Sequence, residues 1–456
     1  MTKDTPSWRL TAGELGSAIR AGRISARVAL ENQIARIDAL NPKLNAVVSL
    51  DLEAARRQAE QVDAARDRGE PLGPLAGVPI TLKDGIDVAC LRTTLGAREL
   101  DRIADADASV AARLKQAGAV ILGHSNVAPF LGDFQTNNAV FGRSLNPWAA
   151  ERTPGGSSGG AAAAVAAGLS SFEVASDLAG SIRQPAAFCG VYGLKPSERR
   201  VPMTGFFNLP GPRPVRILSC LGPLARSLDD LLLVLDVISG PDGADHEIAP
   251  VPLGSSAAPG LAGLRVAVAP ELPFCKVARS LSDEVERLAN ALEGAGVQLT
   301  RTLPGVDWSA AQALFGELAT ELTGPDQTQS LSWYLHALAR RDGIMSAWDR
   351  FFEEVDFVVW PSGMSAAYPH CEPGQPVVVD GQPFPYFAQV GALIPANLAG
   401  VPALAAPAAR DTAGLPLGVQ LIGPRWRDFE LIGFAKALEE VGILPGFAWP
   451  KSLLSP

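Results

Sequence analysis

Three separated segments of the chain contain residues that could together form a nucleophilic site. Lys83 ends the apolar run GVPITLK, Ser157 and Ser158 lie in PGGSSGG, and Ser181 closes the stretch ASDLAGS. A serine hydroxyl becomes a strong nucleophile when a neighbouring base removes its proton. Because burial disfavours the ammonium form, a lysine at the end of a buried strand can lose its proton and serve as that base. The residue types therefore permit nucleophilic catalysis by serine.

Each of these residues also has an ordinary structural interpretation. Lys83 could form an ion pair with Asp84 or Asp87, and Ser181 could cap a turn. A tight turn after an apolar strand can, however, direct successive backbone N–H groups at one anion, as an oxyanion hole requires. Taken one at a time, the structural interpretations are the more common ones.

The PGGSSGG loop matches several known loop types only in part. A phosphate-binding P-loop needs a lysine after its last glycine, where this chain has alanines, and the dinucleotide fingerprint GxGxxG cannot be placed. The nucleophile-elbow pattern GxSxG fits twice, centred on Ser157 and on Ser158, but the preceding NPWAAERTP is not the apolar strand that an elbow follows. The loop leads into AAAAVAAG, a predicted helix with serine at its N-cap position. We therefore expect an ordered loop and not a flexible linker.

The apolar spacing predicts an α/β fold that would position these segments. The N-terminal segment reads as helices, with a capping-box pattern at Thr11–Glu14 and a helix that begins at Ser25 and buries Val28, Ile34 and Ile37. Strand candidates follow at GVPITL, AVILG, FEVAS, LRVAVA and FVVWP, separated by helical stretches such as DASVAARLKQAG and SDEVERLANALEGAG. This alternation predicts a layered α/β fold around a largely buried sheet.

Four other stretches have open interpretations. Residues 240–260 are rich in Pro, Gly, Ala and Ser and fit equally a linker between domains or a surface crossover within one domain. The helical stretch 308–350 reads more readily as a packed pair of core helices than as a lid or pocket wall. Two loops, 205–214 (GFFNLPGPRP) and 368–376 (YPHCEPGQP), are candidates for lining a substrate pocket.

Composition narrows the class of protein. The 456 residues are 47% hydrophobic and 19% charged, enough for a large core, and the net charge of −9 lacks the basic surface that nucleic acid binding needs. No apolar run reaches the ~18 residues that span a bilayer, and no signal-peptide pattern opens the chain. Five scattered cysteines and four scattered histidines favour a reduced, cytoplasmic protein without a metal site. We expect no cofactor.

Taken together and in this order, the segments resemble the amidase signature family. The resemblance includes GVPITLKDGID, FGRSLNPW, PGGSSGGAAAAVAAG, SDLAGSIRQPAAFCGVYGLKP, GPLARSLDDL and PANLAGVPAL…GLPLGVQLIG. It implies an α/β fold with a large mixed, twisted β-sheet covered by helices on both faces. The whole chain, 1–456, would be one domain, with a helical N-terminal segment about 8–66 and a signature core about 75–235. A C-terminal part about 260–450 would complete the sheet and the substrate pocket.

The resemblance also implies roles for individual residues. Ser181 matches the nucleophile, Ser157 the bridging serine, whose preceding peptide bond is cis in the family, and Lys83 the base of a Ser–Ser–Lys triad. Ser158 would support their hydrogen bonds, and Asp177 and Arg183 would brace the turn as an ion pair. The implied oxyanion hole consists of the backbone N–H groups of Leu178, Ala179, Gly180 and Ser181.

The sequence departs from the family pattern at two places. Ala175 and Ala179 stand where the family has glycines around the nucleophile, and alanine at 179 fits only if the backbone there does not need a positive φ. Ser197, Glu198 and Arg199 replace the usual Thr-x-Gly after Lys-Pro. Because the triad residues are present, we do not interpret these changes as loss of activity.

The leading functional hypothesis is an amidase that forms an acyl-enzyme on neutral or aryl amides. Esters and carbamates share the acyl chemistry, so esterase and urethanase activities are compatible with it. The expected partner is a small-molecule amide, ester or carbamate, with no nucleic acid or membrane, for a monomer or homodimer. Two alternatives are the glutaminase subunit of a tRNA-dependent amidotransferase and a catalytically inactive binding protein.

Overall fold

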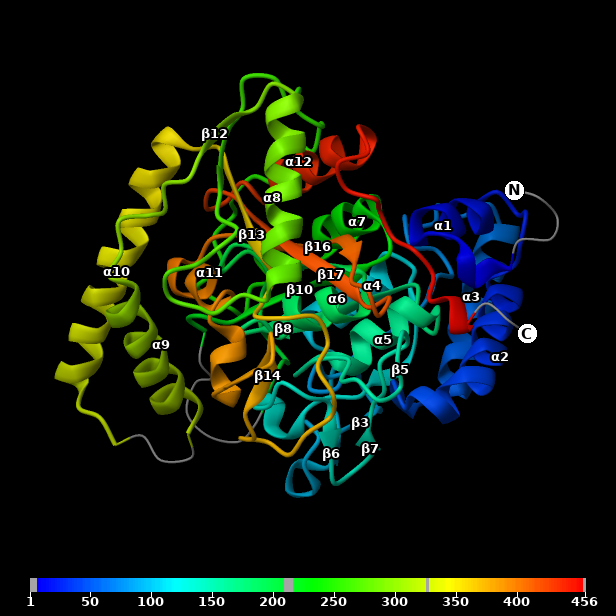
Figure 1. Ribbon diagram of the computed structural model, residues 1–456. Coiled ribbons are helices and arrows are strands. Elements are labelled where there is room, and N and C mark those ends of the chain that lie inside the picture. Colours follow the sequence, from blue (N-terminus) through cyan, green and yellow to red (C-terminus); the bar gives the residue numbers. More distant parts are fainter. Residues whose placement is uncertain (1–5, 209–215, 325–327, 454–456) are drawn as a thin grey trace.

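A computed structural model describes residues 6–208, 216–324 and 328–453, which build a mixed sheet with helices on both faces (Figure 1). Eight strands lie in the order β12-β11-β13-β17-β16-β9-β10-β8. The pairs β11–β12 and β11–β13 are parallel, and the other neighbours are antiparallel. The bounds, in sheet order, are Gln298–Thr300, Arg265–Val268, Phe357–Pro361, Pro416–Ile422, Ala403–Arg410, Tyr192–Lys195, Cys220–Ala225 and Phe172–Asp177.

A second, three-stranded sheet continues the layer at its β8 end. Its strands are β1 (Val47–Leu50), β5 (Val120–Ser125) and β2 (Pro79–Lys83), with β2 and β5 parallel. The Ser171 N–H donates to Pro79 O at 3.3 Å, so β2 runs beside the start of β8. At the other end of the two strands, the Lys83 side chain donates to Ser176 Oγ, so the ends of β2 and β8 also lie close together. Three two-stranded sheets lie in loops, formed by β3 (Arg92–Thr93) with β4 (Arg102–Ile103), β6 (Asn137–Asn138) with β7 (Gly142–Arg143), and β14 (Val377–Val379) with β15 (Gln382–Phe384).

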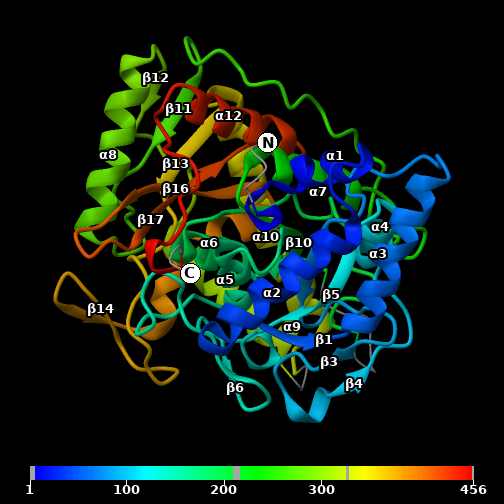
Figure 2. The same ribbon diagram turned by 90° about the vertical axis from the view of Figure 1, so that its right-hand side faces the viewer.

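Helices cover the sheet and extend beyond both of its ends. In Figure 2 α8 lies beside β11 and β12, whereas α2 and α3 lie beside β1 and β5. The α9–α10 pair stands on the side opposite α2 and α3 (Figure 1). The bounds are α1 Ala12–Arg20, α2 Ala26–Leu44, α3 Leu52–Asp67, α4 Ser109–Gln116, α5 Gly159–Ala167, α6 Arg183–Cys189, α7 Leu228–Ile238, α8 Arg279–Gly294, α9 Trp308–Thr323, α10 Leu331–Glu354, α11 Ile394–Ala399 and α12 Asp428–Glu440.

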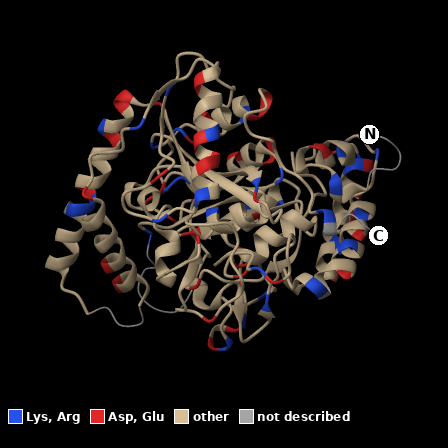
Figure 3. Ribbon diagram, in the orientation of Figure 1, with Lys and Arg blue, Asp and Glu red and all other residues tan. Residues whose placement is uncertain are grey.

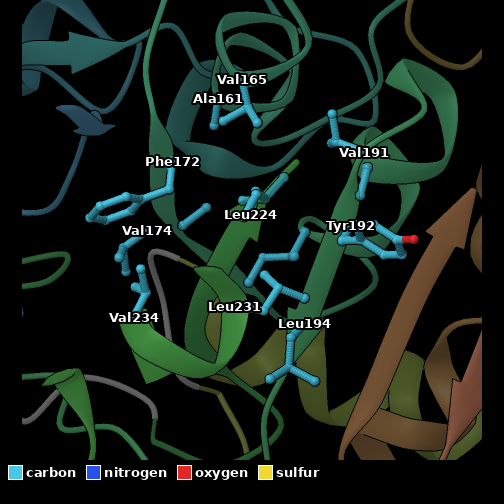
Figure 4. Close-up of a cluster of buried hydrophobic side chains, with 14 of the residues drawn as sticks. Ala161, Val165, Phe172, Val174, Val191, Tyr192, Leu194, Leu224, Leu231 and Val234 are labelled. Carbon is cyan, nitrogen blue, oxygen red and sulfur yellow. The ribbon is translucent and has the colours of Figure 1, made fainter. Parts of the chain in front are cut away.

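The core lies between the sheet and the central helices. Side chains from α5, β8, β9, β10 and α7 meet there, among them Phe172, Leu224 and Val234 (Figure 4). Every residue of α5 is buried, and its small side chains let the helix pack closely on all sides. Many charged residues lie on the outer helices (Figure 3), although several, such as Lys83, Asp177 and Arg183, are buried. Among the described residues, no helix is long and apolar enough to cross a membrane.

The predicted strands and helix starts are largely confirmed. All five strand candidates form strands, namely β2, β5, β8, β11 and β13. Thr11 and Glu14 make the capping box, and the Ser25 side chain accepts the Val28 N–H as N-cap of α2. The predicted burial of Val28 is wrong, because its side chain is 50% exposed. Val28 is two residues from buried Leu30 and therefore about 200° away around the helix.

Two of the open stretches are now assigned. Residues 240–260 connect α7 to β11, which belongs to the same sheet as β10, so this segment is a crossover and not a linker between separate sheets. The stretch 308–350 forms α9 and most of α10. The interpretation as a purely core pair is wrong, because one side of α9 packs on an apolar cluster while other residues of α9 line a cavity.

Candidate active site

Lys83 and Ser157 are in direct contact at the end of β2. The Lys83 side chain is fully buried, and its Nζ donates to Ser157 Oγ at 2.7 Å and to Ser176 Oγ at 2.9 Å. The alternative ion pairs do not form. Asp84 instead accepts hydrogen bonds from the threonines at 93 and 94, and Asp87 accepts from an arginine at 102. The lysine is therefore directed at two hydroxyl groups and not at a carboxylate.

Burial lowers the pKa of Lys83 to about 7. The negative charges of Asp177 and Asp84 oppose this effect, but desolvation of the ammonium is the larger influence. At neutral pH a large fraction of Lys83 is consequently unprotonated and able to accept a proton from a hydroxyl group.

The PGGSSGG loop is ordered and holds Ser157 in a fixed position. The peptide bond Gly156–Ser157 is cis, as the family resemblance implies. The Thr136 hydroxyl donates to Gly155 O at 3.0 Å and accepts the Gly159 N–H at 2.9 Å, so one side chain joins both ends of the loop. Sequence inspection did not single out Thr136, and its position in FQTNNAVFG, near the FGRSLNPW block, is the only signal for it.

The glycines of this loop permit close approach of other backbone segments. A Cβ added to Gly156 would lie 2.5 Å from Asp133 O, and one added to Gly160 would collide with the backbone of Asn126. The nucleophile-elbow interpretation also fails, because no strand leads into the loop among the described residues.

Ser158 has no part in the hydrogen-bond network that we expected it to support. It occupies the N-cap position of α5, but its side chain makes no capping bond. Its hydroxyl is buried and has no partner in the described part of the chain. The physical reason is that Thr136, from a distant segment, already accepts the N–H at the start of the helix.

Ser181 follows a turn that the Asp177 carboxylate folds. Asp177 ends β8 and accepts the backbone N–H groups of Gly180 at 2.9 Å, Ile182 at 3.1 Å and Arg183 at 3.3 Å. The Gly180 N–H is therefore committed to this carboxylate, and we leave it out of the oxyanion donors. The remaining candidates, Leu178, Ala179 and Ser181, donate no backbone hydrogen bond to a described residue.

The Asp177–Arg183 ion pair is fully buried, as the structural interpretation predicted. Arg183 Nη2 donates to Asp177 Oδ1 at 2.8 Å and Nε donates to Oδ2 at 3.0 Å. Burial by itself would raise the pKa of Asp177, but the charge and hydrogen bonds of Arg183 hold that pKa below its ordinary value. The carboxylate thus stays ionised and fixes the turn.

The departures from the family pattern have local explanations. Ala179 is not among the described residues with positive φ, so alanine fits there without a left-handed backbone. Ala175 is buried in the middle of β8. Arg199, which stands where the family has glycine, does have a left-handed backbone with φ of 66°.

Ser157, Ser176 and Ser181 open into one cavity of about 2060 Å³. The Ser181 hydroxyl makes no hydrogen bond with a described residue, and Ser157 and Ser181 both line this cavity. An apolar cluster adjoins the turn before Ser181 and lines the cavity. It includes Phe134, Leu178, Ile217, Phe315, Val390 and Ile394.

The two candidate loops contribute differently to the cavity. Phe206 and Phe207 line it, whereas residues 209–214 of the same loop lie outside the described residues. The loop 368–376 is not part of the lining, so that expectation is wrong. Instead its backbone at Cys371 pairs with the Gln135 side chain behind the cavity wall.

Charged residues of the described lining already have partners, apart from an exposed Glu271. Arg216 pairs with Asp245, Lys276 with Asp380, Glu247 with Arg199, and Glu321 accepts the Gln329 N–H. The described lining thus offers a bound molecule no buried, uncommitted charge. Within the described ranges, no three His, Cys, Asp or Glu side chains gather as a metal-binding set.

Comparison with known proteins finds relatives over nearly the whole chain. The family model for amidases matches residues 29–327 and 320–432. The A subunit of glutamyl-tRNA(Gln) amidotransferase from Moorella thermoacetica is 35% identical over 480 residues, covering 94% of this chain and 96% of that protein.

Solved structures agree in fold. 6-Aminohexanoate cyclic dimer hydrolase is 27% identical with a TM-score of 0.81, covering 99% of this chain and 100% of that one. A bacterial aryl acylamidase has a TM-score of 0.85 at 24% identity, covering 97% of this chain and 98% of that one, which shows a shared fold alone.

Proposed function

Since the chain belongs to the amidase signature family, we propose that it hydrolyses neutral, apolar amides with Lys83, Ser157 and Ser181. The observation that carries the proposal is the buried Lys83 amine, which donates to Ser157 Oγ while Ser157 and Ser181 face the same cavity. A base of lowered pKa beside a hydroxyl relay is the arrangement that activates a serine without histidine.

The proposed reaction has two halves. Neutral Lys83 takes the Ser157 proton, Ser157 takes the Ser181 proton, and Ser181 Oγ attacks the carbonyl carbon. The N–H groups of Leu178, Ala179 and Ser181 stabilise the negative oxygen that develops. The amine then leaves with a proton returned through Ser157, and water cleaves the acyl-enzyme by the same relay.

The lining of the cavity supports a neutral substrate. A ligand group beside the nucleophile turn would contact Leu178, Ile217 and Val390, all apolar. An amino-acid amide would bury an ammonium, and glutamine would bury a carboxylate as well, and each charge needs an opposite charge to offset its desolvation. Because the charged lining residues other than the exposed Glu271 are committed elsewhere, an aryl or alkyl amide is the better fit. Esters and carbamates with the same substituents would react by the same steps.

A second candidate is the glutaminase subunit of a tRNA-dependent amidotransferase. It is supported by the 35% identity to the amidotransferase relative across nearly the full length of both proteins. This function would require glutamine as the acyl donor and partner chains as the destination of the ammonia.

One experiment separates the two candidates. The purified chain alone is assayed with a neutral aryl anilide and with glutamine, and Ser181→Ala serves as the matched control. We expect hydrolysis of the anilide that the control lacks, and no release of ammonia from glutamine. Glutamine hydrolysis without anilide hydrolysis would overturn the proposal in favour of the amidotransferase function.

A further inference from the structure

Leu218 has an unusual backbone conformation at the edge of the cavity. It precedes β10, its φ is 67°, and its side chain is fully buried. A branched residue rarely adopts this left-handed region, and such a conformation persists only where the surrounding structure determines it. The contacts that determine it can be identified.

Two side chains from other segments hold both backbone polar groups of Leu218. Glu198 Oε2 accepts the Leu218 N–H at 2.7 Å, and Asn397 Nδ2 donates to Leu218 O at 2.9 Å. Asn397 also donates to Asp177 Oδ1 at 3.0 Å and accepts from Arg183 Nη2 at 2.5 Å. The same asparagine therefore contacts Leu218 and the ion pair of the nucleophile turn.

Arg341 of α10 contacts both Glu198 and the backbone at Asn397. Its Nη2 donates to Glu198 Oε2 at 2.6 Å and its Nη1 to Glu198 Oε1 at 3.1 Å. Its Nε donates to Leu398 O at 3.0 Å, and Nη2 also reaches Asn397 O at 3.3 Å. The side chains of Arg341 and Glu198 are only 4% and 7% exposed, so neither can exchange its partner for water.

The residues on either side of Leu218 line the cavity beside the nucleophile turn. Ile217 and Ser219 are both part of the lining. Cys220 pairs with Asp177 in the antiparallel β8–β10 ladder, which sets Ser219 opposite Leu178. Ser219 is 7% exposed, and its hydroxyl has no partner among the described residues, so it is free to contact a ligand.

We infer that Glu198 and Arg341 are positioning residues that hold Ile217 and Ser219 against the substrate. The pair fixes Leu218 in its left-handed conformation, and that conformation aims the two flanking side chains into the cavity. The inference rests on the proposed function, because it assigns Ile217 and Ser219 to the recognition of groups next to the scissile bond. Glu198 and Arg341 would therefore set the preference for bulky over small neutral amides without contacting them.

The test compares Glu198→Gln with a matched control, Asp428→Asn, which alters the ion pair bound by the neighbouring Ser197. Ser197 binds Asp428, which forms an equally buried ion pair with Arg200, so Asp428→Asn weakens a similar contact that does not reach Leu218. Two quantities are measured, hydrogen exchange in a peptide spanning 216–222 and the ratio of kcat/KM for a bulky and a small anilide. Arg341→Lys, which keeps the charge but loses the two-pronged contact, serves if Glu198→Gln does not fold.

For Glu198→Gln we expect exchange of the Leu218 amide to rise about tenfold or more and the kcat/KM ratio to fall about tenfold, mainly through KM. Asp428→Asn should leave both unchanged, even if it lowers Tm. Unchanged exchange, or a ratio that moves no further than in the control, would overturn the inference. A wild-type chain that hydrolyses neither anilide would contradict the proposed function instead, while the exchange measurement would still decide whether Glu198 fixes Leu218.

Discussion

The Nζ of Lys83 lies 2.7 Å from Ser157 Oγ with both side chains removed from water. The two residues are 74 positions apart in the sequence, and the packing of α5 against β2 brings the loop that contains Ser157 to the end of β2. A lysine without a carboxylate in hydrogen-bond contact is costly to charge, and this cost is what makes it a base near neutral pH.

The pH dependence of activity should follow Lys83. Its pKa of about 7 means that the neutral, proton-accepting form increases as pH rises through 7. We therefore expect kcat/KM to rise about tenfold per pH unit below 7 and to level off above about 8. Initial rates with a neutral anilide between pH 5 and 9 test this. A profile that is flat across pH 7, or that falls as pH increases, would count against Lys83 as the base.

The same lysine should reduce stability at neutral pH. Its pKa lies below the unfolded value of 10.5, so between pH 10.5 and 7 the unfolded chain binds a proton that the folded chain does not. As pH falls through that window the free energy of unfolding therefore decreases. Below pH 7 this group changes it no further. Lys83→Met should raise the free energy of unfolding at pH 7 by on the order of 1 kcal/mol or more while abolishing activity. Urea unfolding of both proteins at pH 7 and pH 10 measures this, and an advantage for Lys83→Met that does not shrink at pH 10 would refute it.

Ser157 and Ser158 should respond very differently to substitution. Ser157→Ala removes the hydroxyl that accepts from Lys83, so we expect kcat to fall about 10³-fold or more. Ser158→Ala removes a hydroxyl that has no described partner, so kcat should change by less than about threefold. Steady-state kinetics of the two variants provide the comparison. Equal losses would mean that the roles of the two serines are wrongly assigned.

Thr136 should support both the loop and the reaction. Thr136→Val loses the bonds to Gly155 O and the Gly159 N–H, which should cost about 1–2 kcal/mol of unfolding free energy and lower kcat. Thr136→Ser keeps the hydroxyl and should retain most of both. Denaturant unfolding and kinetics of this pair test the prediction, and identical behaviour of valine and serine variants would show that the hydroxyl is not what matters.

Arg199→Gly should stabilise the protein slightly. Arg199 bears the cost of a left-handed backbone, and its 3.5 Å ion pair with Glu247 is partly exposed and therefore weak. After the entropy cost of glycine in the unfolded chain, a net gain of about 0.5 kcal/mol is expected. Arg199→Ala is the control, since it removes the ion pair but keeps Cβ. A glycine variant no more stable than the alanine variant would show that the backbone is not strained there.

The sequence predicted those parts of the site that lie within contiguous motifs. Lys83, Ser157 and Ser181 each stand in a block recognisable on its own, and the strands before Lys83 and Ser181 follow from short apolar runs. Thr136 and Asn397 could not be assigned, because their roles depend on contacts with residues far away in the chain. The misjudged role of Ser158 has the same origin, since the N-cap of α5 is satisfied by a side chain that spacing within the loop does not reveal.

In the fold, too, the features that depend on distant contacts could not be assigned from local sequence. The crossover at 240–260 and the α9 wall of the cavity have compositions that suit two arrangements each. Only the presence of β10 and β11 in the same sheet and the packing of α9 decide between them. The left-handed Leu218 leaves no mark in local sequence. Its conformation is set by Glu198 and Asn397, which lie 20 and 179 positions away.

The most direct test of the central claim is peptide mapping by mass spectrometry after treatment with a serine-directed fluorophosphonate. The mechanism predicts a single adduct on Ser181 in the purified chain, with labelling that slows below pH 7 and disappears in Lys83→Met. An adduct on Ser157 or Ser158 with Ser181 unmodified would contradict the assignment of the nucleophile, and the absence of any adduct would contradict an activated serine in the chain alone.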